Sequence, residues 1–211
     1  MEPVCELIEA MVVTKSSCSS TGYPSIEGME ETDFDLVKAV GAGDHQAFEY
    51  LVKKYRSSVF NFVYRCLGER QAAEDILQEV FLALYRAASR FEPRAQVSTW
   101  LFKIAYNLSM NEIKRRKRHL DLSEALHALP RQDAGPSASS TIEAGELRKN
   151  VMTALDQLPE NQKAAMLLRL NEELSYAEIS EVLSVSVSSA ESLIFRARTR
   201  LRQLLKEEMK E

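Results

Sequence analysis

The sequence predicts an all-α protein built from two small helical domains joined by a flexible linker. From Asp33 onward, apolar residues recur at spacings of three and four, and no stretch alternates as a half-buried strand would. Residues 119–142 lose this periodicity and collect proline, glycine and serine, which indicates a linker between domains. A chain of 211 residues can hold two small domains, each with its own core.

The N-terminal residues 1–31 are rich in Ser, Glu and Thr, and we expect them to form a disordered acidic tail. Their first 20 residues lack a basic leader, so no secretory signal is expected. Cys5, Cys18 and Cys66 are odd in number and widely spaced, which favours neither a disulfide framework nor a zinc site. These features predict a cytoplasmic protein.

The first predicted domain covers residues 32–118. A short helix begins near Asp33, Asp44 is the expected N-cap of the next helix, and that helix should end near Gly68. A further helix over about 71–90 has Asp75, Gln78 and Glu79 together on the side opposite its apolar face. A polar helix face of this kind is most often simply solvated.

The last helix of this domain follows a loop containing Pro93, and Ser98 or Thr99 is its expected cap. Its first half is aromatic and its second half ends in the basic run KRRKR at 114–118. Aromatic groups beside cations suit a surface on which unpaired bases stack. The alternative is that most of the apolar groups are core, so that only two or three face outward.

The second predicted domain covers residues 143–211 and ends in a helix-turn-helix at 175–205. Ser184, Val185 and Ser186 interrupt the helical period, and an apolar stripe then runs from Val187 to Leu204. The opposite face carries small polar groups first and arginines later, as a helix in the major groove requires. A surface helix pair with solvated arginines is the alternative.

Charge is segregated along the chain although the net charge is only −4. Basic patches at 114–118 and 196–206 lie within an otherwise acidic protein, as expected of a nucleic-acid binder. The sequence contains no motif of a nucleophilic or metal-dependent enzyme and no cysteine pair at ligand spacing. We therefore expect no catalytic residue, no metal site and no cofactor.

Three segments together resemble the extracytoplasmic-function (group 4) sigma factors of bacterial RNA polymerase. They are AEDILQEVFLALYR at 73–86, STWLFKIAYNLSMNEIKRRKR at 98–118, and the stretch from LPENQ to ARTRL at 158–201. The resemblance implies a region-2-like first domain and a region-4-like second domain. The implied partners are the beta and beta-prime subunits of core RNA polymerase, promoter DNA and an anti-sigma factor, often membrane-bound, with no small-molecule substrate.

The resemblance also implies roles for individual residues. Contacts to the polymerase are expected from Asp75, Gln78, Glu79, Leu82 and Tyr85. Recognition and melting of the minus-ten element are expected from Trp100, Lys103, Tyr106, Asn107, Asn111, Lys114, Arg115, Arg116, Lys117 and Arg118. Recognition of the minus-thirty-five element is expected from Ser188, Ser189, Glu191, Ser192, Phe195, Arg196 and Arg198.

Glu191 departs from the family pattern, in which an arginine is common at this position. A carboxylate can accept a hydrogen bond from cytosine N4, so Glu191 would favour cytosine on the strand that it reads. Alternatively, Ser188 to Glu191 form a capping box that closes the start of the helix. The capping box is the preferred interpretation, because it satisfies two otherwise unpaired N–H groups.

Two other functions remain open at this level. One is a conventional helix-turn-helix regulator that binds closed duplex DNA as a dimer, and the other is a helical adaptor that binds only proteins. The predicted linker also permits a compact free protein with its basic patches partly covered.

Overall fold

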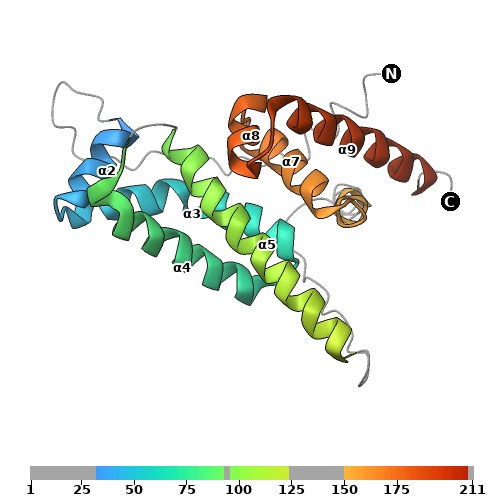
Figure 1. Cartoon of the computed structure of the whole chain (residues 1–211), viewed down its shortest axis with the longest axis horizontal. Coiled ribbons are helices and arrows are strands. Elements are labelled where there is room, and N and C mark those ends of the chain that lie inside the picture. Colours follow the sequence, from blue (N-terminus) through green and yellow to red (C-terminus); the bar gives the residue numbers. More distant parts are fainter. Residues whose placement is uncertain (1–31, 93–95, 124–149, 209–211) are drawn as a thin grey trace, which may run out of the picture.

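The computed structural model describes residues 32–92, 96–123 and 150–208, and within these ranges all regular structure is helical (Figure 1). The helices are α2 (Asp33–Gly41), α3 (His45–Leu67), α4 (Arg70–Ala87), the 3-10 turn η1 (Ala88–Arg90), α5 (Val97–Ser123), α7 (Glu160–Asn171), α8 (Tyr176–Leu183) and α9 (Val187–Glu208). Residues 150–156 are also helical. The predicted tail at 1–31 and most of the predicted linker lie outside the described residues.

Helices α2 to α5 form the first bundle, in which α3, α4 and α5 pack against one another. Its centre contains the fully buried side chains of Leu51, Phe62 and Phe102, and the last two rings meet edge to face with centroids 5.6 Å apart. Helix α2 closes one end against η1, where a Cβ on Gly41 would lie 2.8 Å from the carbonyl oxygen of Ala88. Glycine is therefore required at the point where these backbones meet.

The predicted caps of α3 are confirmed. The Asp44 carboxylate accepts hydrogen bonds from the N–H groups of Gln46 and Ala47, and Gly68 ends the helix with a left-handed φ of 71°. Thr32 caps α2 in a capping box with Asp35. These local motifs set the lengths of the first two helices.

Helix α5 corrects the sequence prediction at both ends. It begins at Val97, with the Trp100 N–H bonded to the Gln96 carbonyl, so neither Ser98 nor Thr99 is its cap. The Thr99 side chain is buried within the first turn. At the other end α5 continues to Ser123, so the first five residues of the predicted linker are helical. The sequence HLDLS at 119–123 contains neither Gly nor Pro, and nothing in it interrupts the helix.

The second bundle is built around α7, which contacts both α8 and α9. Every residue from Ala164 to Leu168 is buried, so this helix is enclosed on all sides. The apolar stripe predicted on α9 is confirmed from Ala190 to Leu204. Val187 is the exception: it is 44% exposed, because the first turn of α9 projects beyond the bundle core.

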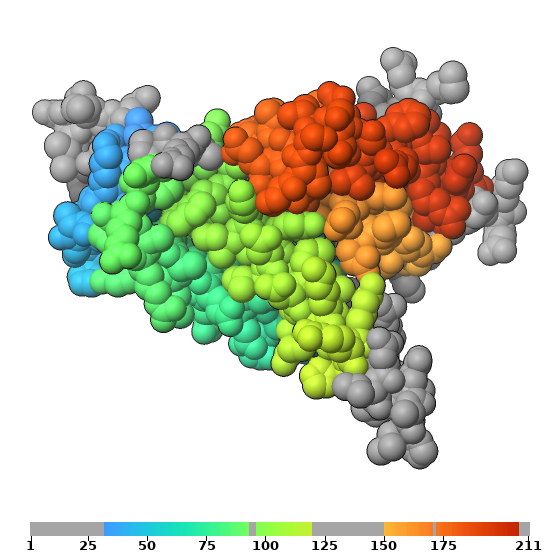
Figure 2. Space-filling model, in the orientation of Figure 1, coloured from blue at the N-terminus to red at the C-terminus, as the bar shows by residue number. Residues whose placement is uncertain are grey.

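The two bundles pack directly against each other. Helix α5 contacts α8, and α3 contacts α7. Figure 2 shows the orange and red second bundle lying on the green part of α5. In the part of the chain that the structure describes, no helix combines the length and apolar character needed to cross a membrane.

Candidate nucleic-acid interface

The outer face of α4 carries the residues expected to contact the polymerase. Asp75, Gln78 and Glu79 are exposed, and Leu82 and Tyr85 continue the same face toward the end of the helix. Leu82 is 49% and Tyr85 44% exposed, although both are large apolar side chains. An acidic face that also exposes apolar groups suits a protein partner better than DNA.

The ring of Phe48 in α3 packs against the ring of Tyr85. From the sequence, Phe48 was only one member of the apolar stripe of α3, so this contact was not predicted. The two rings meet edge to face with centroids 5.4 Å apart. Tyr50, also on α3, is 40% exposed. Aromatic groups that are held rigidly at a surface contribute contact area with little loss of entropy.

The aromatic half of α5 is divided between core and surface, as the sequence allowed. Leu101 and Phe102 are buried, whereas Asn107 and Asn111 are exposed. Trp100 is half-buried and its ring is tilted against that of Phe91, with centroids 4.9 Å apart. Lys103 is also half-buried.

Tyr106 is oriented differently from the other minus-ten candidates. Its side chain is only 8% exposed, and its hydroxyl donates a 3.0 Å hydrogen bond to Oδ1 of Asn161 in α7. Burial raises the pKa of the Tyr106 phenol. A ring in this position cannot stack on an extruded base unless the two bundles first move apart.

The basic run at 114–118 is partly neutralised within the protein. Glu112 binds Arg115 at 2.8 Å and Arg116 at 2.7 Å, and hydrogen bonds from both arginines hold the pKa of its carboxyl below the usual range. Arg116 also pairs with Glu69 at 2.7 Å. The pairing by Glu112 follows from its helical spacing of three and four, a signal that the sequence contained.

Other cations of the run differ in their pairing. Lys117 pairs with Glu160 of α7, across the junction of the two bundles. Lys114 and Arg118 are exposed, and neither forms an ion pair with any residue that the structure describes. These two side chains therefore carry most of the unbalanced positive charge of the run.

The junction between the bundles has further polar contacts. The Thr99 hydroxyl lies 3.5 Å from Glu178 of α8 and donates to it. Glu172 also lies at the junction, and burial raises the pKa of its carboxyl despite a hydrogen bond from Ser58 and the charge of Arg65. No sequence signal predicted these contacts, because the partners lie on different bundles.

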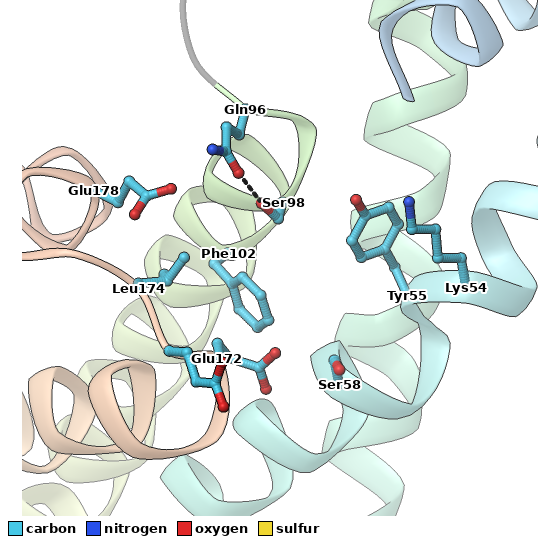
Figure 3. Close-up of a pocket in the computed structure, with 10 residues that line it drawn as sticks. Lys54, Tyr55, Ser58, Gln96, Ser98, Phe102, Glu172, Leu174 and Glu178 are labelled. Atoms are coloured by element: carbon cyan, nitrogen blue, oxygen red, sulfur yellow. Dashed lines mark hydrogen bonds between the residues drawn. The ribbon is translucent and has the colours of Figure 1, made fainter. Parts of the chain in front are cut away.

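An open cavity of about 490 Å³ lies at this junction (Figure 3). Lys54, Tyr55 and Ser58 of α3 lie on one side, and Glu172, Leu174 and Glu178 of the second bundle lie on the other. Lys54 and Tyr55 are both already bound to Asp33, at 2.6 and 2.5 Å. Over the described ranges, no group of His, Cys, Asp and Glu is arranged to hold a metal ion.

Helix α9 presents the face expected to read DNA without obstruction. Ser188, Ser189, Glu191, Ser192 and Arg196 are exposed. Phe195 is 71% exposed, the highest value among the exposed large apolar side chains of the described residues. Arg198 is half-buried. The face combines small polar groups near the start, an exposed aromatic ring and cations farther along.

The start of α9 corrects the preferred interpretation of Glu191. Ser186 is the cap: its hydroxyl accepts a 3.2 Å hydrogen bond from the Ser189 N–H, and its carbonyl accepts from Ala190. Ser188 is already inside the helix, so a capping box from Ser188 to Glu191 cannot form. The cap lies two residues earlier than predicted, because four serines near this turn could each begin the helix.

The turn and the first helix of the motif are otherwise as expected. Ser175 and Glu178 form a capping box at the start of α8. Ser184 ends α8 in a left-handed conformation with φ of 55°, and the Val185 N–H bonds back to the Ser180 carbonyl. The chain therefore reverses sharply between α8 and α9, and the polar face of α9 points outward.

Both bundles match family models of known proteins. Residues 51–119 match the family model described as Sigma-70 region 2, and residues 148–201 match that described as Sigma-70, region 4. The chain is 33% identical over 189 residues to the RNA polymerase sigma-H factor of Pseudomonas aeruginosa, covering 86% of this chain and 98% of that protein. It is 32% identical over 178 residues to the ECF RNA polymerase sigma factor SigW of Bacillus subtilis, covering 81% and 95%.

Two solved structures have a similar fold. One is the sigma factor RpoE in complex with the anti-sigma factor NepR from Bartonella quintana, with a TM-score of 0.64, 21% identity and coverage of 75% of this chain and 96% of that one. The other is CnrH in complex with the cytosolic domain of CnrY, with a TM-score of 0.63, 23% identity and coverage of 84% and 99%. Taken with the sequence matches, these likenesses show that the chain belongs to the sigma-70 family and is an RNA polymerase sigma factor of the extracytoplasmic-function group.

Proposed function

We propose that the two bundles divide promoter recognition between them. The first domain, residues 32–118, binds core RNA polymerase and opens the minus-ten element, and the second, residues 143–211, binds the minus-thirty-five element. The observation that carries this proposal is the outward face of α9, which ends a helix-turn-helix and exposes Phe195 and Arg196 to solvent. The protein acts as an initiation factor in the cytoplasm and leaves catalysis to the polymerase.

Docking on the polymerase uses the outer face of α4. Leu82 and Tyr85 supply apolar contact, and Asp75, Gln78 and Glu79 supply the charge and polarity that align the partner. Burial of exposed apolar groups at a protein interface is favourable, and surrounding acidic groups select a basic partner surface. A Leu82→Asp variant should lose core binding while the free protein keeps its thermal stability.

Opening of the minus-ten element uses the outer part of α5. Trp100, Lys103, Asn107 and Asn111 are accessible in part or in full, with Lys114 and Arg118 available for phosphates. Unpairing a base costs a few kcal/mol, and a surface that stacks and hydrogen-bonds the extruded base offsets that cost. Recognition of the sequence and separation of the strands then occur in one step.

The packing of the two bundles is an inactive arrangement on this proposal. Tyr106 is held by Asn161 and Lys117 by Glu160, so two minus-ten candidates are engaged inside the protein. Binding to the polymerase must separate the bundles before these side chains reach DNA. One structure of similar fold shows the sigma factor RpoE bound to the anti-sigma factor NepR, and another shows CnrH bound to the cytosolic domain of CnrY. These complexes support control of this chain by an anti-sigma factor.

Fluorescence of promoter DNA tests the proposal. DNA carrying 2-aminopurine near the minus-ten element is mixed with the purified chain, with core polymerase, or with both. We expect brightening only when both proteins are present, because melting needs the bundles opened on the polymerase. DNA binding by the free chain, with no brightening in the mixture, would instead support a conventional regulator of closed duplex DNA.

A further inference from the structure

Glu191 is an exposed acid on the DNA-facing side of α9, and it has no role in the fold. Ser186 caps the helix, so the carboxylate is not needed there. Over residues 150–208 it accepts no hydrogen bond and forms no ion pair. The residues three and four positions away are Val187, Ser188, Ile194 and Phe195, none of which is a cation that could hold it along the helix.

A carboxylate on this face is unfavourable unless it meets a hydrogen-bond donor. DNA phosphates repel it, and an ionised carboxylate can only accept hydrogen bonds. In the major groove, guanine presents two acceptors and thymine one, so both bases repel the carboxylate. Adenine presents a donor beside an acceptor, whereas cytosine presents the N4 amino group alone. Cytosine is therefore the base that a carboxylate tolerates best.

We propose that Glu191 is a specificity-determining residue that selects cytosine and excludes guanine at one position of the minus-thirty-five element. The inference rests on the proposed function of α9 as the helix that reads this element. It adds which base is selected there and which side chain selects it.

The surroundings of Glu191 allow its carboxylate to reach a base edge. Ser188 lies one turn earlier and Ser192 is its neighbour, and both are small and exposed. Phe195 lies one turn later on the same face, about 6 Å along the helix axis at 1.5 Å per residue.

Substitutions at Glu191 make the inference testable, because each side chain pairs with a different base. Holoenzyme is reconstituted from core polymerase with wild-type protein, E191Q, E191R or E191A, and transcribes a promoter library randomised across the minus-thirty-five element. Wild type should enrich cytosine at one position by about tenfold over guanine. At that position E191Q should shift the preference to adenine, E191R should shift it to guanine, and E191A should remove it. E181Q, an exposed acid on α8, is the matched control and should leave the profile unchanged.

The outcomes separate failure of this inference from failure of the proposed function. If E191Q and E191A strengthen transcription from every library member equally, Glu191 acts only by repelling phosphates, and the inference is wrong. If wild type selects a minus-thirty-five sequence but no position responds to Glu191, the inference is also wrong while the function of α9 stands. If wild-type holoenzyme initiates without selecting any sequence in the randomised element, the proposed function of α9 itself fails. Thermal unfolding confirms that each variant is folded, since the site is exposed.

Discussion

The two surfaces proposed to bind DNA differ in what surrounds them. The face of α9 is open, and Phe195 and Arg196 project from it into solvent. The face of α5 is partly occupied by the protein itself, because Asn161 holds Tyr106 and Glu160 holds Lys117. The α9 surface is available in the packed arrangement, whereas Tyr106 and Lys117 of the α5 surface need the bundles to separate. On the proposed function, separation of the bundles would therefore control the α5 surface and leave the α9 surface unaffected.

The largest expected effect concerns the uneven pairing of the basic run on α5. Replacing Lys114 and Arg118 by alanine should reduce the slope of log affinity against log salt by about two units, at about 0.9 per phosphate contact. Replacing Arg115 and Arg116 should reduce it less, because Glu112 already neutralises part of their charge. Salt titration of promoter-complex formation by each holoenzyme measures both slopes. Equal reductions would show that the internal ion pairs do not limit contact with DNA.

On the open face of α9, Phe195 provides the next largest effect. Phe195→Ala should weaken promoter binding by about 1–3 kcal/mol, the usual effect of losing one base contact. Its thermal stability should stay within about 0.5 kcal/mol of wild type, because 71% of the side chain is exposed. Binding of holoenzyme to fluorescent promoter DNA and thermal unfolding of the free chain make the comparison. A loss of stability equal to the loss of binding would assign the ring to the core instead.

Removal of the hydrogen bond to Tyr106 should have a smaller effect, and only on the closed surface. Asn161→Ala removes the acceptor and should destabilise the packing of the bundles by about 0.5–1.5 kcal/mol. Energy transfer between one dye on each bundle should report a larger open fraction. Gln157→Ala, an exposed position on the same bundle, is the control. An unchanged open fraction would mean that the hydrogen bond does not hold the bundles together.

The smallest expected effect is a dependence of bundle packing on pH, with two carboxyls acting in opposite senses. The hydrogen bond from Lys117 lowers the pKa of Glu160 below 4.5, so its stabilisation is present above that value and is lost as the pH falls through the lowered pKa. Burial raises the pKa of Glu172 above 4.5, so packing is favoured at low pH and weakens as the pH rises through the raised pKa. Packing should therefore be strongest at a pH between the lowered pKa of Glu160 and the raised pKa of Glu172, which lie on either side of 4.5.

The same energy-transfer measurement, repeated across pH, tests this dependence. Glu172→Gln should abolish the weakening on the alkaline side, because the amide carries no charge to desolvate. Glu160→Gln should abolish the weakening on the acidic side. A wild-type open fraction that does not change with pH would show that neither carboxyl controls the packing.

Many features of the fold and of the candidate interfaces could be predicted from the sequence because they are local. The caps at Asp44 and Gly68, the exposed face of α4 and the polar face of α9 follow from helical periodicity and from residues within one turn. Predictions from local sequence were wrong where several neighbouring residues could each begin a helix. The serines before α9 are the clearest example, since Ser186 caps the helix and Glu191 is left exposed.

The sequence by itself determined that the chain is helical, where its basic and apolar faces lie, and to which family it belongs. Only the tertiary structure decided which of the proposed DNA contacts are accessible. Tyr106 and Asn161 are 55 residues apart, Lys117 and Glu160 are 43 apart, and Thr99 and Glu178 are 79 apart. A helical period reports which face of one helix is apolar, but it carries no information about which face of another bundle packs there. For this reason the availability of α9 was visible in the sequence, whereas the burial of Tyr106 was not.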